Sequence, residues 1–168
     1  MKVYKDFLPQ EQFNNLKNIV ESNDFPWFYS NGATDNHNED IPYDHQFVHF
    51  FYQRNSVCSK YYEYLVPILN KLKIFSLIKI KANLSTRVPK IQTNQYHIDL
   101  PDRPKDLKMK TAIYYLNNSN GPTKFKNGTE IKCEENKFIE FNSKLEHTSV
   151  FGTNSNKRIV INFNYLSF

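Results

Sequence analysis

From Ile74 to the C-terminus, hydrophobic and polar residues alternate with a period of two, which is typical of half-buried β-strands. The alternation predicts short strands near residues 75–85, 90–98, 110–117, 123–126, 129–133, 137–142, 145–150 and 157–166. Turn signals separate these strands at 117–122, 127–128, 134–136 and 152–156. Asn127-Gly128, between two of the strands, predicts a β-hairpin. So many short strands in about ninety residues predict a mainly β fold, a double-stranded β-helix or jelly roll.

The N-terminal part of the chain follows a different pattern. Residues 9–22 carry apolar side chains on one face of a predicted helix, and residues 56–72 do the same, with Pro67 as a possible kink. Two aromatic stretches, 24–29 and 46–53, are expected to be a strand or loop and an extended segment. We therefore expect two supporting helices beside the jelly roll.

The chain has no internal repeat and no linker, which predicts a single domain over residues 1–168. Within it, residues 1–73 would form the helical support and the substrate-side segment, and residues 74–168 the jelly-roll core. Residues 30–44 are polar and predict a long loop, and loops of that length are often functional.

The composition favours strands over helices and leaves the partner open. Of the 168 residues, 39% are hydrophobic and 15% aromatic, with 14 Phe and 11 Tyr. The net charge of +5 and the pI near 9.1 would allow an acidic partner but do not require one.

Two cysteines, Cys58 and Cys133, stand far apart and in no metal-binding or redox spacing. The N-terminus has no apolar run of the kind found in signal peptides, and no window is apolar over the length that spans a bilayer. We therefore expect a soluble protein of a reducing, cytoplasmic compartment, without a membrane partner.

The stretch with the most chemical content is Tyr96-His97-Ile98-Asp99. Side chains alternate along an extended backbone, so His97 and Asp99 point the same way and can share one metal ion. His147 is available as a third ligand, and Arg158 follows at the start of an apolar strand. Two histidines and one carboxylate form the facial triad that holds non-haem Fe(II) with open positions. The planar fork of an arginine suits a dicarboxylate co-substrate.

In the order of these residues, the chain resembles the 2-oxoglutarate- and Fe(II)-dependent oxygenases, within them the prolyl 4-hydroxylase-like branch, and looks like compact versions encoded by marine bacteria and phages. The resemblance covers about residues 75–168. The segments that carry it are Ala82-Asn83-Leu84, Tyr96-His97-Ile98-Asp99, Thr111-Ala112-Ile113-Tyr114-Tyr115-Leu116-Asn117, Gly121-Pro122-Thr123-Lys124-Phe125, His147 and Arg158-Ile159-Val160-Ile161-Asn162-Phe163.

The resemblance implies Fe(II) as cofactor, and 2-oxoglutarate and O2 as co-substrates. His97, Asp99 and His147 would ligate the metal, and no catalytic side chain beyond the metal centre would be needed. Arg158 would pair with the distal carboxylate of 2-oxoglutarate, and Tyr115 would donate its hydroxyl to that same carboxylate. The implied reaction is hydroxylation of an unactivated C–H bond, of a prolyl residue in a peptide or protein, with release of succinate and CO2.

Two further positions, Asn162 and Leu84, bear on how the metal and the co-substrate would be held. Arg158, Val160 and Asn162 share one face of a strand, which makes Asn162 a candidate to support the metal or the co-substrate. The family commonly carries a tyrosine that helps to bind 2-oxoglutarate where this chain has Leu84, which cannot form that hydrogen bond. Either another group replaces the tyrosine, or fewer bonds hold the co-substrate.

Other functions remain open at this point. The substrate could be a peptide, a protein or a small molecule. The demethylase branch, which acts on alkylated nucleic acid, typically has a second arginine six residues after the first. Asn164 stands there, which argues against a nucleic-acid substrate. A jelly-roll module that binds a metal or small ligand without turnover is the alternative from another class.

Two loops could contact the substrate. Residues 30–44, with His37 and the adjacent His45, could act as a substrate lid. The spacing of His37, His45 and His49 fits no second metal site, so surface or core histidines are the simpler interpretation. The loop after the metal ligands carries four basic residues that could steer an acidic substrate, or that could simply be solvated. These are Arg103, Lys105, Lys108 and Lys110.

Overall fold

The computed structural model describes residues 1–32, 43–100 and 108–168. The helical elements are α1 (Gln10–Val20), a 3₁₀ turn η1 (Tyr62–Leu65) and α2 (Val66–Leu69). The strands are β1 (Lys2–Tyr4), β2 (Phe28–Ser30), β3 (Gln46–Gln53), β4 (Ser56–Val57), β5 (Ile74–Thr86), β6 (Gln92–Thr93), β7 (Met109–Tyr115), β8 (Ser119–Phe125), β9 (Glu130–Cys133), β10 (Lys137–Asn142), β11 (His147–Phe151) and β12 (Lys157–Ser167).

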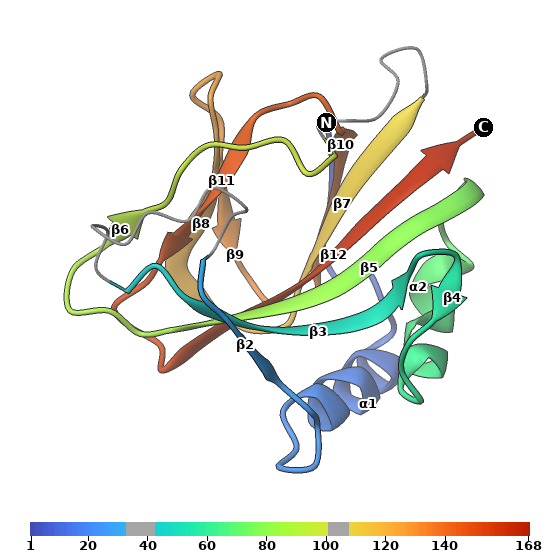
Figure 1. Ribbon diagram of the computed structural model, residues 1–168, viewed down its shortest axis with the longest axis horizontal. Coiled ribbons are helices and arrows are strands. Elements are labelled where there is room, and N and C mark those ends of the chain that lie inside the picture. The colour runs from blue at the N-terminus through green and yellow to red at the C-terminus, as the bar shows by residue number, and fades with distance from the viewer. Residues whose placement is uncertain (33–42, 101–107) are drawn as a thin grey trace.

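The strands form two antiparallel sheets that face each other. The larger sheet has the order β1-β10-β7-β12-β5-β3-β2, with β4 paired to β3, and the smaller has the order β6-β11-β8-β9. Figure 1 shows the helices beyond one face of the larger sheet and the smaller sheet on its other side. This architecture confirms the mainly β jelly roll predicted from the period-two alternation.

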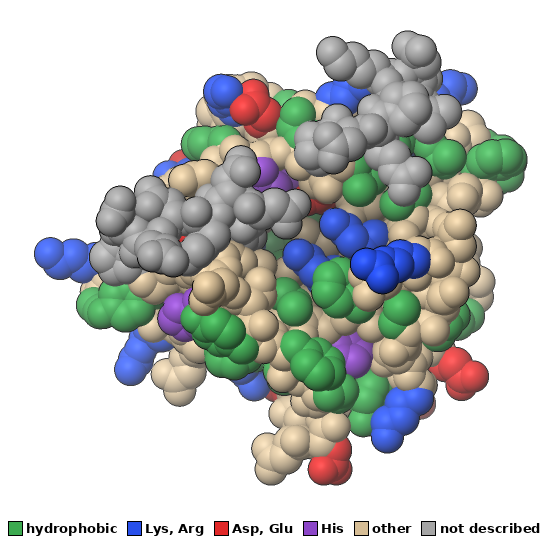
Figure 2. Space-filling view, viewed as in Figure 1, with side chains coloured by type: hydrophobic (Ala, Val, Ile, Leu, Met, Phe, Trp, Pro, Cys, Tyr) green, Lys and Arg blue, Asp and Glu red, His purple; other side chains and the backbone are tan. Residues whose placement is uncertain are grey.

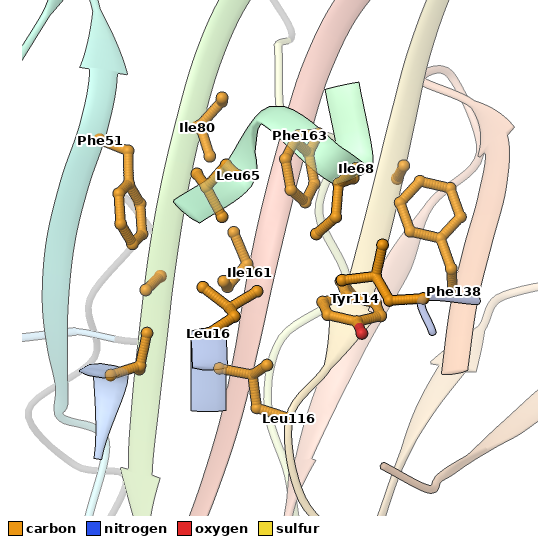
Figure 3. Close-up of a cluster of buried hydrophobic side chains, with 14 of the residues drawn as sticks. Leu16, Phe51, Leu65, Ile68, Ile80, Tyr114, Leu116, Phe138, Ile161 and Phe163 are labelled. Carbon is orange, nitrogen blue, oxygen red and sulfur yellow. The ribbon is translucent and has the colours of Figure 1, made fainter. Parts of the chain in front are cut away.

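Alternation along the central strands gives the larger sheet two different faces. The outer face packs under the helices and is apolar, as the buried side chains in Figure 3 show. Leu16 of α1 packs there with Ile161 and Phe163 of β12 and Ile80 of β5. On the inner face, a smaller cluster that includes Tyr115 joins the two sheets. Polar residues on this inner face therefore lie between the sheets, where a ligand could reach them.

The register of β5 against β12 fixes which polar residues are neighbours. Arg158 lies opposite Ser85, Val160 opposite Asn83, and Asn162 opposite Lys81. Directly opposed residues in an antiparallel pair project from the same face. The inner face thus carries Arg158 and Ser85 side by side.

The prediction of a helix over residues 9–22 is confirmed by α1, but the helix predicted over 56–72 is wrong at its start. Ser56–Val57 instead pairs with the end of β3 through a two-residue turn at Arg54 and Asn55. Both turn residues have positive φ, 52° and 60°, as in the tight turns that suit hairpins. Pro67 lies in the first turn of α2, and its ring would clash with a carbonyl one turn earlier if the helix extended toward the N-terminus.

Two strand predictions also differ from the structure. The strand predicted over 90–98 is reduced to β6 and one isolated bridge between His97 and His147. The turn predicted over 117–122 belongs largely to β8, which begins at Ser119. Gly121 is explained by close packing, because a Cβ there would lie 2.1 Å from the carbonyl oxygen of Val150.

Gly128, in contrast, has the positive φ of 89° that its turn requires, and it closes the predicted hairpin between β8 and β9. Cys58 and Cys133 are both free thiols. Among the residues that the structure describes, no helix is long and apolar enough to cross a membrane.

Candidate metal centre

The backbone brings the two histidines together from distant parts of the sequence. His97 donates its N–H to the carbonyl of His147 at 2.9 Å, and His147 returns the bond at 3.0 Å. This antiparallel pairing sets the two imidazole rings 4.7 Å apart, centroid to centroid. Asp99 follows two residues after His97, and one ligand atom from each of the three residues lies within 4.8 Å of the others.

Hydrogen bonds leave one nitrogen of each imidazole free to bind a metal. Nδ1 of His97 lies 3.3 Å from the carbonyl of Gln95, and Nδ1 of His147 lies 3.1 Å from the carbonyl of Leu145. A carbonyl can only accept, so each Nδ1 carries the proton. The two Nε2 atoms face Asp99 Oδ1, at 3.5 Å and 3.8 Å. Backbone carbonyls often orient metal-binding histidines in this way, so the donor set fits one divalent ion.

Burial and charge favour the protonation states that a metal needs. Burial lowers the pKa of His147 and outweighs the opposing effect of the Asp99 carboxylate, so its imidazole is neutral at pH 7. Burial would raise the pKa of Asp99, but its interactions with His97, His147 and Asn164 hold that pKa well below its usual range. A neutral imidazole and an ionised carboxylate are the forms that coordinate a metal.

Asn164 of β12 holds the other oxygen of Asp99. Its Nδ2 donates to Asp99 Oδ2 at 2.9 Å and to Thr111 Oγ1 at 3.1 Å, and its side chain is fully buried. The residue that we predicted for such support, Asn162, makes no described contact with the triad. The signal was present in the sequence, because Asn164 is the next polar residue on the same face of an apolar strand.

We predict that Asn164→Ala weakens metal binding about 10- to 100-fold, the range typical of outer-sphere partners of metal ligands. Without the amide, Asp99 can rotate and Oδ1 no longer has a fixed position between the two Nε2 atoms. Titration with Mn(II), followed by electron paramagnetic resonance, measures the affinity. Asn162→Ala serves as the control, and equal losses in the two variants would show that Asn164 has no special part.

Arg158 is buried at the other end of the site. Its Nε donates to the carbonyl of Gly121 at 2.9 Å, and its Nη2 donates to Thr123 Oγ1 at 3.1 Å. Its guanidinium carbon lies 5.8 Å from the centroid of the Tyr115 ring. The Tyr115 hydroxyl donates to Thr123 Oγ1 at 2.8 Å, and burial raises its pKa, which keeps the phenol protonated. The contact predicted between Tyr115 and a co-substrate would therefore compete with its bond to Thr123.

One cavity joins the triad to Arg158. Its walls come from both sheets: Gln46, Lys81, Asn83, Ser85, His97, Asp99, Ile113, Thr123, His147, Ser149, Phe151, Arg158, Val160 and Asn162. Asn162 thus lies in the wall, with its Oδ1 buried and without a described hydrogen-bond partner. Tyr115 is not among the lining residues, whereas its partner Thr123 is. Leu84 packs on the opposite face of β5, against the core under the helices.

The other candidate residues lie elsewhere. Lys110 pairs with Glu140 at 3.8 Å, and Lys108 is exposed. His45 lies near the Tyr29 ring, 5.9 Å away. His37, Arg103 and Lys105 fall outside the described residues, as does most of the predicted lid.

On the face shown in Figure 2, Lys and Arg side chains gather near the middle of the molecule, where the surface is hollowed.

Comparison with solved structures gives matches over nearly the whole chain. A viral collagen prolyl hydroxylase from Paramecium Bursaria Chlorella virus-1, solved with 2OG, has a TM-score of 0.59 at 16% identity, covering 99% of this chain and 95% of that chain. A prolyl hydroxylase from Trichoplax adhaerens, in complex with a hypoxia inducible factor peptide fragment, has a TM-score of 0.65 at 15% identity. The match covers 99% of this chain and 83% of that chain.

HygX from Streptomyces hygroscopicus, with nickel, 2-oxoglutarate and hygromycin B bound, has a TM-score of 0.59 at 10% identity, covering 98% of this chain and 82% of that one. No family model matches the sequence, and no curated protein matches it. The chain therefore has the fold of the 2-oxoglutarate- and Fe(II)-dependent oxygenases across its length, whereas the resemblance in the sequence covered only about residues 75–168.

Proposed function

We propose that this protein is a 2-oxoglutarate- and Fe(II)-dependent dioxygenase that hydroxylates an unactivated C–H bond and releases succinate and CO2. The observation that carries the proposal is the cavity itself, which holds two imidazole nitrogens, one carboxylate oxygen and a buried arginine in a single space. Hydrogen bonds to both Nδ1 atoms and to the second carboxylate oxygen orient the three remaining donor atoms toward one another.

In this proposal, His97, Asp99 and His147 hold Fe(II) from one side. The iron, when bound, supplies the activation of O2 that no amino-acid side chain can provide. Asn164 keeps Asp99 in position, so that one oxygen faces the metal and the other stays bound to the amide. Arg158 would bind the distal carboxylate of 2-oxoglutarate, because its guanidinium is buried in the cavity wall and its positive charge is permanent.

We further propose a prolyl residue of a peptide or protein as the substrate. Two of the structures compared above are prolyl hydroxylases, and one of them holds a peptide. HygX, with hygromycin B, shows that the same fold also serves a small molecule. The position where a nucleic-acid demethylase would carry its second arginine is Asn164, which here is committed to Asp99. This assignment supports a substrate other than nucleic acid.

The proposal is tested by turnover of 2-oxoglutarate. We expect the anaerobic protein with Fe(II) and 2-oxoglutarate to show a visible charge-transfer band, and admission of O2 to yield succinate. Proline-containing peptides should accelerate succinate release and gain the mass of one oxygen atom, which mass spectrometry measures. Peptides in which alanine replaces proline are the control. A protein that binds Fe(II) but forms neither band nor succinate would instead be a metal-binding module.

A further inference from the structure

A buried serine hydroxyl without a partner lies in the wall of the cavity. Ser85 of β5 is only 6% exposed, and its Oγ has no hydrogen-bond partner in the part of the chain that the structure describes. Buried hydroxyl groups are normally hydrogen-bonded, because leaving one unsatisfied is unfavourable. An exception that faces a ligand cavity points to a partner that arrives with the ligand.

The position of Ser85 indicates which part of a ligand it would meet. Ser85 lies directly opposite Arg158 in the pairing of β5 with β12, so the two side chains leave the same face of the sheet as neighbours. Both line the cavity, together with Thr123 of β8. Ser85 therefore lies at the arginine end of the cavity.

Thr123 completes a set of donors at this end. Its Oγ1 accepts one hydrogen bond from the Tyr115 hydroxyl and another from Arg158 Nη2. A hydroxyl oxygen has two acceptor sites, so its own hydrogen must be directed elsewhere, and the cavity is adjacent. Arg158, Thr123 and Ser85 thus present N–H and O–H groups to one region, where an anion with several acceptor sites would satisfy them.

We propose that the Ser85 hydroxyl donates a hydrogen bond to the distal carboxylate of 2-oxoglutarate. This inference rests on the function proposed above. It also answers the question that Leu84 raised: Leu84 packs against the core on the outer face of β5, and the next residue supplies the hydroxyl on the inner face. An ionised carboxylate has about four acceptor sites, enough for the arginine fork and both hydroxyls.

The inference is tested with two keto acids that differ only in the distal group. The wild type and Ser85→Ala are titrated anaerobically with 2-oxoglutarate and with 2-oxopentanoate in the presence of Fe(II), and the charge-transfer band reports binding. We expect Ser85→Ala to bind 2-oxoglutarate about 10- to 100-fold more weakly, because a hydrogen bond to a charged group is lost. Binding of 2-oxopentanoate, which has no distal carboxylate, should be unchanged. Ser76→Ala, on the exposed part of β5, is the matched control.

Thermal unfolding without ligand separates this role from a structural one. Ser85→Ala removes an unsatisfied buried hydroxyl, so its melting temperature should equal or exceed that of the wild type. Unchanged 2-oxoglutarate affinity in Ser85→Ala overturns the inference, and so does an equal loss for both keto acids. Absence of a band in the wild type would instead overturn the proposed function, and this inference with it.

Discussion

Replacing Asp99 by alanine should abolish Fe(II) binding and, with it, the release of succinate from 2-oxoglutarate. Asp99 is the anionic donor of the cluster, and its Oδ1 lies within 4 Å of both histidine Nε2 atoms, at 3.5 Å and 3.8 Å. Without it, the two imidazoles alone would have to hold the ion. We expect the affinity to fall by more than the roughly 100-fold upper range of outer-sphere changes. Isothermal titration with Fe(II) under anaerobic conditions measures the loss.

Glu146→Ala is a matched control for this substitution. Glu146 precedes His147, but its carboxylate is paired with Lys126, at 2.8 Å and 2.9 Å from the Lys126 Nζ, and takes no part in the cluster. Removal of this carboxylate should leave Fe(II) affinity and turnover unchanged. If Asp99→Ala retained the affinity of the wild type while remaining folded, the three residues would not be the metal site.

That His97, Asp99 and His147 lie together could be predicted from the sequence, by strand alternation and by the resemblance. Alternation puts His97 and Asp99 on one side of an extended segment. The resemblance then selected His147 from the remaining histidines. The structure adds what neither could give, namely the pairing between the His97 and His147 backbones that holds the rings together.

The residues around the ligands were harder to predict, because they depend on register. Alternation placed Asn162 and Asn164 on the same face, but only the three-dimensional position of Asp99 decides which amide reaches it. Likewise, the string Ala82-Asn83-Leu84 matched Leu84 to a tyrosine of the family that helps to bind 2-oxoglutarate, and left open which group, if any, replaces it. The pairing of β5 with β12 puts Ser85, not Leu84, on the inner face beside Arg158, because a shift of one residue changes the face of the sheet.

The fold, too, could be predicted from the sequence in some parts and not in others. Period-two alternation was enough for most strands, and three apolar positions at helical spacing were enough for α1, where Phe13, Leu16 and Val20 are buried. The apolar positions of residues 56–72 suggested a helix equally well. There the hairpin turn at Arg54 and Asn55 was decisive. Asn55 is of a residue type that readily adopts positive φ, but Arg54 is not.

Replacing Arg158 by methionine should raise the concentration of 2-oxoglutarate required for turnover by about 30-fold or more. Truncating one member of a buried, hydrogen-bonded charge pair costs roughly 2 kcal/mol or more of binding free energy, which corresponds to that factor. Methionine keeps an unbranched apolar stem in the same space. Fe(II) affinity should change little, because Arg158 bonds to Gly121 and Thr123 and not to the metal ligands. Succinate release as a function of 2-oxoglutarate concentration measures the effect.

The matched control is Lys157→Met, which removes a positive charge one residue away. Lys157 lies 3.4 Å from Glu21, outside the cavity, so the variant should keep the wild-type requirement for 2-oxoglutarate. The 2-oxoglutarate requirement of Arg158→Lys should lie between those of Arg158→Met and Lys157→Met. An ammonium keeps the charge but cannot form the fork of parallel hydrogen bonds. Equal effects of Arg158→Met and Lys157→Met would mean that only the overall charge attracts 2-oxoglutarate. A specific loss in Arg158→Met would place the distal carboxylate at the end of the cavity where Ser85 and Thr123 also lie, because all three residues line the same wall.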